Sequence, residues 1–321
     1  MARMIVMTSV LVYGAYGHTG RFVVAELRKR GFEPVLSGRD AARLPGGRPA
    51  SADDPASLDR AFDGVAAVIN CAGPFAVTAR PVAEAAIRAG VPYVDVAAEI
   101  EANLDTFELA AETAVVPAMA FFGGLADLLA TVAMGDWPAA DEVHVAYGLS
   151  GWHPTPGTLA AGRVSRERRA GRRVRYAGGR LEYRDDALPS LEWAFPEPLG
   201  PRPVLGEFSM ADIVTIPRHL QVRDVTSYMT LDAAEGLAAA GERDSAETFV
   251  VEVVVRAGGA ERRIVARGED IYAVSAPLAV EAVERILAGR TRVKGVAPAG
   301  EMFDAGDFLR ALAPRITVEQ R

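Results

Sequence analysis

The 321-residue chain lacks the features that mark several large classes of protein. It has one cysteine, Cys71, so no internal disulfide can form, and we expect a reducing, cytoplasmic location. Its net charge of −7 argues against general binding of nucleic acid. No apolar run is long enough to span a bilayer, so no membrane association is expected. The histidines and the cysteine show no metal-ligand spacing, so no metal is expected.

What the chain does contain is a glycine triplet, Gly14, Gly17 and Gly20, near its N-terminus. An apolar run over residues 10–13 precedes the triplet, and apolar residues at helical spacing follow it. This pattern predicts a strand, a tight turn and a helix whose first turn binds the pyrophosphate of a dinucleotide, because unpaired N–H groups and the helix dipole favour an anion there. The spacing G-x-x-G-x-x-G is looser than G-x-G-x-x-G, so a glycine-rich turn of another α/β protein is the alternative.

The end of the second predicted strand, over residues 35–36, indicates which dinucleotide is bound. Folds that bind NAD place Asp or Glu there to hold the ribose 2′-hydroxyl, whereas an arginine suits a 2′-phosphate. Here the strand runs into Ser37, Gly38 and Arg39, and no carboxylate comes before Asp40. Arg39 therefore favours NADP(H) as the cofactor; the alternative is that Arg39 is a solvated arginine of the loop.

The order of the predicted elements gives the domain organisation. Strands and helices alternate up to about residue 126, and the predicted strands then become longer and alternate in polarity. We therefore predict an α/β fold with an N-terminal Rossmann domain, a doubly wound parallel sheet, over residues 1–126. A second α+β domain with a mainly antiparallel sheet is predicted over residues 127–271. Helices over residues 272–321 are expected to return to the Rossmann domain, and residues 1–7 to lead into the first strand.

Several local predictions within this plan can be compared with a structure. Residues 104–113 are predicted as a helix, and residues 213–216 as a strand. Residues 257–260, Ala-Gly-Gly-Ala, predict a hairpin between two long strands. Nine arginines lie between Arg163 and Arg184, where a helix end and another hairpin are predicted. This cluster is either a solvated face or a docking surface for an acidic partner, such as a carrier-bound or phosphorylated substrate.

Polar residues follow the strands that are predicted to end at the cofactor. Asn70 begins a loop with a Gly-Pro pair, which would let the backbone approach the nicotinamide ribose; a plain turn is the alternative. Asp95 and Glu99 follow the next strand at the same edge of the sheet, where they either cap the loop and the next helix or act in acid–base chemistry. His219 is the best candidate for a substrate contact from the second domain.

Several motifs resemble those of the saccharopine dehydrogenase-like (saccharopine reductase) superfamily, and most closely its short branch with the trans-acting enoyl reductases: GAYGHTG, SGRD, NCAGPF, YVDVAAE and FFGGLADLLA. The resemblance implies a Rossmann domain and a substrate-binding domain that often mediates dimers, so a homodimer is expected. It also implies which residues hold the cofactor. The pyrophosphate would contact Gly14, Tyr16, Gly17, His18, Thr19 and Gly20, the 2′-phosphate would contact Arg39, and the nicotinamide ribose would contact Asn70, Ala72 and Gly73.

These observations predict an NADPH-dependent oxidoreductase that transfers hydride to a C=N or activated C=C bond of a small metabolite. Asp95 and Glu99 would orient the substrate or relay a proton. Short-chain dehydrogenase chemistry is excluded, because neither Lys29 nor Lys294 is preceded by the tyrosine of a Tyr-x-x-x-Lys pair. The lack of an obvious proton donor leaves an alternative from another class, a non-catalytic NADP(H)-binding sensor or scaffold.

Overall fold

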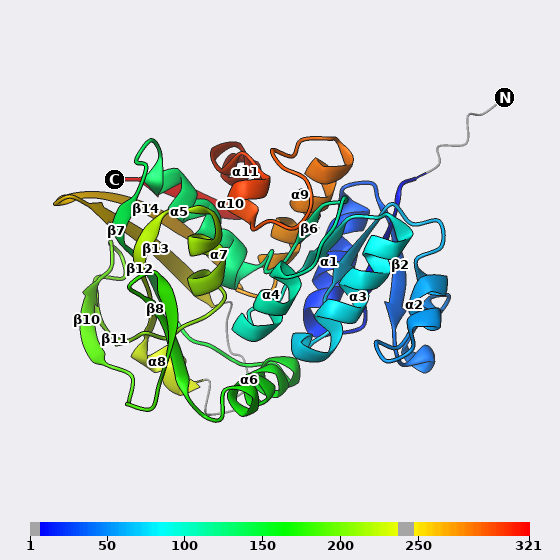
Figure 1. The fold of residues 1–321 in the computed structure, drawn as a ribbon, viewed down its shortest axis with the longest axis horizontal. Helices are drawn as coiled ribbons and strands as arrows, with labels where there is room; N and C mark the ends of the chain where they lie inside the picture. The colour runs from blue at the N-terminus through cyan, green and yellow to red at the C-terminus, as the bar shows by residue number, and fades with distance from the viewer. Residues whose placement is uncertain (1–6, 237–246) are drawn as a thin grey trace.

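The computed structural model describes residues 7–236 and 247–321, so most of the predicted N-terminal lead-in, residues 1–6, lies outside the described residues. Two β-sheets organise the chain: a parallel sheet in its N-terminal part and a larger, mostly antiparallel sheet after it (Figure 1). This arrangement confirms the predicted fold class. One cluster of buried apolar side chains includes both sheets, from Val12 in the first to Val251 in the second. The domain boundaries at residues 126 and 271 therefore stay predictions.

The first sheet is the parallel sheet that the alternating pattern predicts. Its strands are β1 (Ser9–Tyr13), β2 (Glu33–Gly38), β3 (Arg48–Pro49), β4 (Ala67–Asn70), β5 (Tyr93–Asp95) and β6 (Val115–Val116). They lie in the order β3-β2-β1-β4-β5-β6, which is the order of a doubly wound dinucleotide-binding fold. The central strands β1 and β4 are almost entirely buried, as expected for parallel strands with helices on both faces.

Helices follow the strands of this sheet in turn. They are α1 (His18–Lys29), the short 3₁₀ helix η1 (Ala41–Arg43), α2 (Pro55–Ala61), α3 (Phe75–Ala89) and α4 (Ile100–Phe107). The bounds predicted for the last helix, residues 104–113, are wrong. The side chain of Asn103 donates to the carbonyl oxygens of Ala97 and Glu99, which holds the first turn of α4 close to the end of β5. The buried face of α4 then ends at Phe107.

Within the described residues, the second sheet has nine strands. They are β7 (Ala140–Leu149), β8 (Arg173–Ala177), β9 (Arg180–Arg184), β10 (Ser190–Ala194), β11 (Pro201–Gly206), β12 (Val222–Thr230), β13 (Thr248–Ala257), β14 (Ala260–Glu269) and β15 (Ile316–Gln320). The main path is β10-β11-β12-β7-β13-β14-β15, and the hairpin of β8 and β9 lies beside β12. Among the pairs that the structure describes, β7 with β12 is parallel and the others are antiparallel. The hairpin predicted at residues 257–260 joins β13 to β14 and is confirmed.

The strand predicted over residues 213–216 is wrong, because these residues belong to α7 (Asp212–His219). A short apolar run cannot by itself distinguish a strand from a buried helix. In α7, Ile213 and Ile216 are both fully buried at helical spacing. The other helical elements of this part of the chain are the π-type turn η2 (Phe121–Leu125), α5 (Ala126–Met134), α6 (Pro156–Arg168) and α8 (Leu231–Gly236).

Residues 272–321 connect the two sheets. The helix α9 (Ser275–Leu287) packs on α1, β4 and β5, and Arg30 of α1 forms ion pairs with Glu281 and Glu284 of α9. In contrast, α10 (Ala299–Met302) and α11 (Ala305–Ala311) pack on α5, which itself contacts β13 and β14 of the second sheet. The chain then adds β15 beside β14, a strand that the sequence analysis did not predict. Only the first of the expected C-terminal helices therefore returns to the Rossmann sheet.

Candidate functional site

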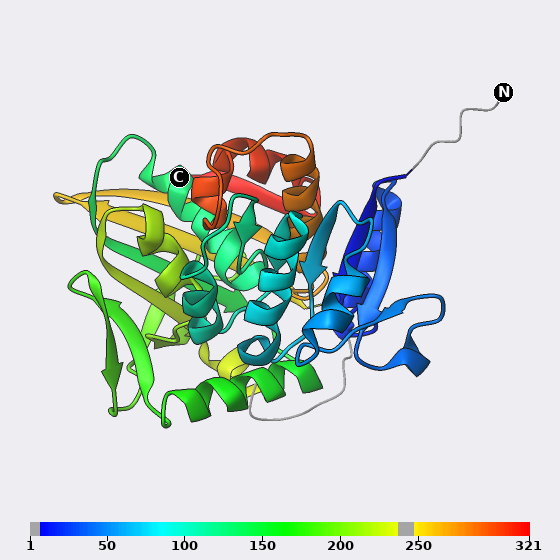
Figure 2. The ribbon, with the colours of Figure 1, turned by 45° about the vertical axis from the view of Figure 1, so that its right-hand side comes forward.

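A cleft of about 1280 Å³ runs along the carboxyl ends of the parallel strands, the edge at which open α/β sheets bind ligands. One wall consists of the glycine turn and the loops after β2, β4 and β5. The other wall comes from residues around Trp152, from α6 and from Tyr272. Figure 2 shows α6 crossing beneath α3 and α4 on this side of the molecule. The cleft is larger than a typical ligand pocket, whose volume is roughly 300–1,000 Å³.

The glycine turn is shaped by close approaches that only glycine allows. Gly14 has a φ of +84°, and a Cβ there would lie 2.8 Å from the backbone nitrogen of Ala72. A Cβ on Gly20 would lie 2.2 Å from the carbonyl oxygen of Gly14. Within the described residues no side chain caps the first turn of α1, which begins at His18. Its N–H groups are therefore open to an anion, and the turn fits a dinucleotide pyrophosphate.

Most of the predicted cofactor residues line the cleft, and two shape it from behind. Those in its lining are Gly14, Tyr16, Gly17, His18, Thr19, Arg39, Ala72 and Gly73. Gly20 instead packs against the glycine turn. Asn70 is fully buried, and its side-chain oxygen accepts a 3.0 Å hydrogen bond from the backbone N–H of Ala72. Asn70 therefore holds the loop after β4 in place from below the cleft.

Two arginines after β2 lie at the cleft, Arg39 and Arg43. The guanidinium of Arg43 lies over the ring of Tyr16, 4.3 Å from its centroid. The Tyr16 hydroxyl also accepts a 3.4 Å hydrogen bond from the backbone N–H of Asp40. Tyr16 of the glycine turn thus holds the loop that carries both arginines. Arg43 was not among the predicted cofactor residues, and its only signal in the sequence was its place four residues after Arg39.

A buried polar network supports the loops after β4 and β5. Asn70 donates to the hydroxyl of Tyr93 at 3.2 Å, and Tyr93 donates to Asp95 at 2.8 Å. Asp95 is fully buried and also accepts from the backbone N–H groups of Ala97 at 3.0 Å and Ala118 at 2.8 Å. Burial raises the pKa of Asp95 to about 6, so at neutral pH these three donors hold an ionised carboxylate. This geometry favours the capping interpretation of Asp95 over a direct role in acid–base chemistry.

An Asp95→Ala protein should be strongly destabilised. Each of the three donors that Asp95 now satisfies would remain buried without this acceptor, at a cost of about 1–3 kcal/mol for each group. We expect the free energy of unfolding in urea at pH 7 to fall by about 3 kcal/mol or more. The exposed Asp63, in the same domain, provides the matched control. Asp63→Ala should change the free energy of unfolding by less than about 0.5 kcal/mol. Equal losses in the two proteins would contradict the role of Asp95.

Glu99 is the predicted carboxyl group that does reach the cleft. The backbone N–H of Phe75 donates to its Oε2 at 2.8 Å and more weakly to Oε1 at 3.2 Å, so Glu99 caps α3 rather than α4. Burial raises the pKa of Glu99 to about 8, against the opposing effect of the Phe75 hydrogen bond and with added repulsion from Asp95 and Glu101. Glu99 is therefore mostly protonated at neutral pH, and a neutral carboxyl group at the cleft can donate a proton.

The structure does not bring His219 to the cleft. It lies at the end of α7, where its Nε2 lies 2.8 Å from Oδ1 of the fully buried Asp127. Burial disfavours the imidazolium, but the Asp127 carboxylate outweighs this effect and raises the pKa of His219. Asp127 also accepts a 2.6 Å hydrogen bond from the backbone N–H of Gly300. His219 therefore belongs to a contact among α5, α7 and α10. The sequence could not predict this contact, because the three helices are far apart along the chain.

Tyr272 connects the two walls of the cleft. Its hydroxyl accepts a 3.0 Å hydrogen bond from the indole N–H of Trp152 and lies 2.9 Å from the hydroxyl of Thr158. His18 of the glycine turn packs edge-on against the Tyr272 ring, with the two centroids 5.1 Å apart. Trp152, Thr158 and Tyr272 are not among the predicted site residues, and none of them belongs to a motif that indicated a ligand contact.

The sheet order and the glycine turn define a dinucleotide-binding Rossmann protein. Residues 10–119 match the family model of the saccharopine dehydrogenase NADP binding domain. A human saccharopine dehydrogenase-like oxidoreductase is 29% identical over 28% of this chain and 27% of the human protein. These matches confirm the resemblance to the saccharopine dehydrogenase-like superfamily over residues 10–119. The chain matches about a quarter of the length of this curated relative.

Solved structures are also similar to part of the chain. A short-chain dehydrogenase/reductase superfamily protein from Agrobacterium tumefaciens with bound NAD is 28% identical, covering 31% of this chain and 34% of its own, with a TM-score of 0.25. A nucleoside-diphosphate-sugar epimerase from Pseudomonas aeruginosa is 27% identical, covering 27% of this chain and 33% of its own, with a TM-score of 0.24. Within the described residues, no helix has the length and apolar character to cross a membrane, and no cluster of His, Cys, Asp or Glu could hold a metal ion.

Proposed function

We propose that this protein is an NADPH-dependent oxidoreductase that transfers hydride to a C=N or activated C=C bond of a small metabolite. The observation that carries the proposal is that a glycine turn suited to a dinucleotide and the carboxyl group of Glu99, whose pKa burial raises to about 8, line the same cleft. The matched NADP-binding domain and the oxidoreductase name of the human relative support the reaction class. The position of Arg39 after β2 supports NADP over NAD.

In this proposal the chain orients the cofactor with groups from three loops. The glycine turn would hold the pyrophosphate at the start of α1, Arg39 and Arg43 would hold the 2′-phosphate, and Ala72 and Gly73 would contact the nicotinamide ribose. When bound, the cofactor would supply hydride from the C4 atom of its nicotinamide. The size of the cleft leaves space for the acceptor beside it, between the loop after β4 and the second wall.

Glu99 would supply the proton that the reduced product needs. When hydride adds to the carbon of a C=N bond, an electron pair moves to the nitrogen, which then takes the proton; in a conjugated C=C bond the α-carbon takes it. The shorter hydrogen bond from Phe75 goes to Oε2, which leaves Oε1 to carry the proton. Asp95 would act indirectly, since it orders the loop that leads to Glu99.

A binding titration followed by a turnover screen tests the function. Enhanced fluorescence of NADPH on titration with the protein would report binding. The protein should then oxidise NADPH, seen as loss of the reduced-nicotinamide absorbance, with at least one member of a panel of imines and enoyl thioesters. Tight NADPH binding without oxidation across a broad panel would contradict the proposal and favour a non-catalytic NADP(H) sensor or scaffold.

Replacing Arg39 tests the cofactor preference. An Arg39→Asp protein should bind NADPH about 100-fold more weakly and prefer NADH, because it loses a charge-assisted contact and places a carboxylate beside the 2′-phosphate. The measurement is the ratio of the NADPH and NADH dissociation constants. Arg28→Asp makes the same change of charge at an exposed position of α1 outside the cleft and should keep the ratio. An unchanged ratio in the Arg39→Asp protein would refute the role of Arg39.

A further inference from the structure

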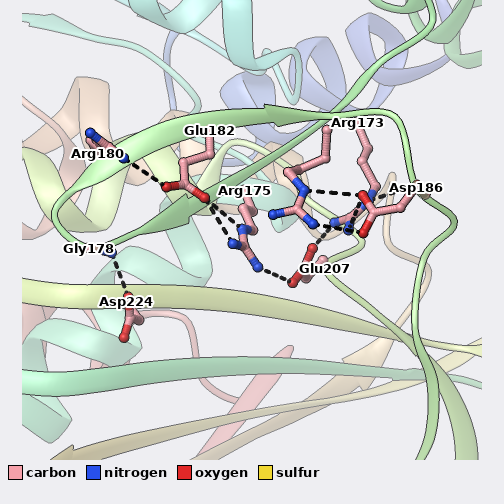
Figure 3. Close-up of polar contacts among 9 residues, drawn as sticks. Arg173, Arg175, Gly178, Arg180, Glu182, Asp186, Glu207 and Asp224 are labelled. Carbon is pink, nitrogen blue, oxygen red and sulfur yellow. Dashed lines mark hydrogen bonds and ion pairs between the residues drawn. The ribbon is translucent and has the colours of Figure 1, made fainter.

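The arginine cluster predicted from the sequence largely neutralises itself in the folded chain. In the hairpin of β8 and β9, Arg175 lies between two carboxylates, 2.9 Å from Glu182 and 3.1 Å from Glu207. Arg173 lies 2.7 Å from Asp186 (Figure 3). These guanidinium groups already have anionic partners within the protein. The hairpin is therefore a poor surface for an additional acidic partner.

Two arginines of α6 line the cleft without a carboxylate partner among the described residues. Arg169, just after the helix, lies 3.0 Å from the buried carboxylate of Glu101. Arg163 and Arg166 are exposed and line the cleft. Within the described residues they form neither an ion pair nor a hydrogen bond with a carboxylate. At α6 the cleft thus has two cationic groups that no carboxylate of the described part of the chain balances.

The spacing of these residues places them on one face of α6. Arg166 comes three residues after Arg163, and Leu159 comes four residues before it, so the three side chains are neighbours along the helix. All three line the cleft. Like charges at this spacing destabilise a helix, and an anion bound between them would remove the repulsion. Leu159 is 45% exposed and adds an apolar contact beside the charged pair.

The proposed contacts of the 2′-phosphate lie at the other end of the cleft. Arg39 and Arg43 follow β2, which lies on one side of the central strand β1. The helix α6 contacts α3 and α4, which follow β4 and β5 on the other side of β1. Val77 of α3, 58% exposed, also lines the cleft. A dinucleotide whose 2′-phosphate lies at Arg39 therefore leaves the arginines and the apolar side chains of this end for a second molecule.

We infer that Arg163 and Arg166 form a subsite for an anionic group, either a phosphate or a carboxylate, on the molecule that the enzyme reduces. Guanidinium groups bind both anions through paired, charge-assisted hydrogen bonds. Leu159 and Val77 would contact an apolar part of the same molecule, so the substrate class is an amphipathic anion. The identification of this molecule as the substrate rests on the proposed function, whereas the subsite rests on the geometry of α6.

Calorimetric titration of the NADP⁺-loaded protein with matched probes tests the subsite. One pair of probes is pantetheine 4′-phosphate and pantetheine, and the other is hexanoate and hexanamide. The protein should bind the anion of at least one pair about 10-fold more tightly than its neutral partner, and the pair that shows the preference distinguishes phosphate from carboxylate. An Arg163→Gln/Arg166→Gln protein should lose this preference while its affinity for NADPH stays unchanged.

A control protein separates the subsite from the effect of net charge. Arg28→Gln/Arg310→Gln removes the same charge at two exposed positions outside the cleft and should keep the preference. No preference in the unmodified protein, or equal losses in the two double variants, would overturn the subsite. NADPH turnover measured in parallel distinguishes the two proposals: turnover without any preference for anions refutes the subsite alone, and preference without turnover refutes the reductase alone.

Discussion

A Gly20→Ala protein should bind NADPH at least about 100-fold more weakly than the unmodified protein. The added Cβ would lie 2.2 Å from the carbonyl oxygen of Gly14 and 3.0 Å from the Cα of Ala15, and both of these atoms belong to the backbone. No side-chain rotation can relieve such a contact, so the glycine turn must move away from α1. The N–H groups at the start of α1 would then no longer face the pyrophosphate.

Fluorescence titration with NADPH measures this loss, and thermal unfolding shows whether the protein is still folded. The matched control is Gly306→Ala in α11, where the nearest atom to the added Cβ is the end of the flexible Arg310 side chain at 3.5 Å. This control should keep its NADPH affinity and gain up to about 1 kcal/mol of stability, because alanine favours a helix over glycine. A folded Gly20→Ala protein with ordinary NADPH affinity would show that the turn does not bind the dinucleotide.

The first sheet could be predicted from the sequence because each of its elements carries a local signal. Buried parallel strands such as β4 are continuous apolar runs, and the glycine triplet marks the turn between β1 and α1. The second sheet was harder to predict. The apolar pattern of residues 213–216 is compatible with a strand and with a buried helix. The contacts of Asp212 with the N–H of Gly123 and the hydroxyl of Tyr147 help to hold α7 as a helix. Those partners lie far away in the sequence.

The cofactor half of the candidate site could be predicted for the same reason, since its residues follow successive strands of one sheet. The second wall could not. Trp152, Thr158 and Tyr272 meet only because α9 returns to the first sheet and because α6 crosses below α3. His219 is the opposite case. A histidine in a polar segment suggests a ligand contact, but in the folded chain His219 contacts the carboxylate of Asp127. Both the second wall of the cleft and the environment of His219 depend on contacts between residues that are far apart in the sequence.

A Glu99→Gln protein should have a kcat at least about 100-fold lower than the unmodified protein, because general acid catalysis contributes about 10²- to 10⁴-fold. Glutamine keeps the shape of the protonated carboxyl group and can still accept from the N–H of Phe75, but it has no acidic proton to donate. In the unmodified protein kcat should fall as the pH rises through about 8, since burial raises the pKa of Glu99 to about 8 and only the acid form donates. The variant should lack this decline.

The stability of the unmodified protein should also depend on pH through the titration of Glu99. The folded-state pKa of Glu99 lies above its ordinary value, so the folded protein holds a proton that the unfolded chain releases. The resulting stability is fully present below the ordinary glutamate pKa and is lost as the pH rises to about 8. Thermal unfolding across this range should show the loss in the unmodified protein and not in Glu99→Gln.

The half-exposed Glu84 of α3 gives the control for both measurements. It pairs with Arg80 at 2.9 Å, and Glu84→Gln should change neither kcat nor its dependence on pH. The pH profile decides the role of Glu99, because a weaker hydrogen bond from the N–H of Phe75 would also lower kcat by misplacing the loop before α3. A Glu99→Gln protein with reduced kcat but an unchanged decline above pH 8 would make Glu99 a positioning residue and place the proton donor elsewhere in the cleft. A Glu99→Gln protein that has both a reduced kcat and no decline of kcat above pH 8 would assign the proton donor to Glu99.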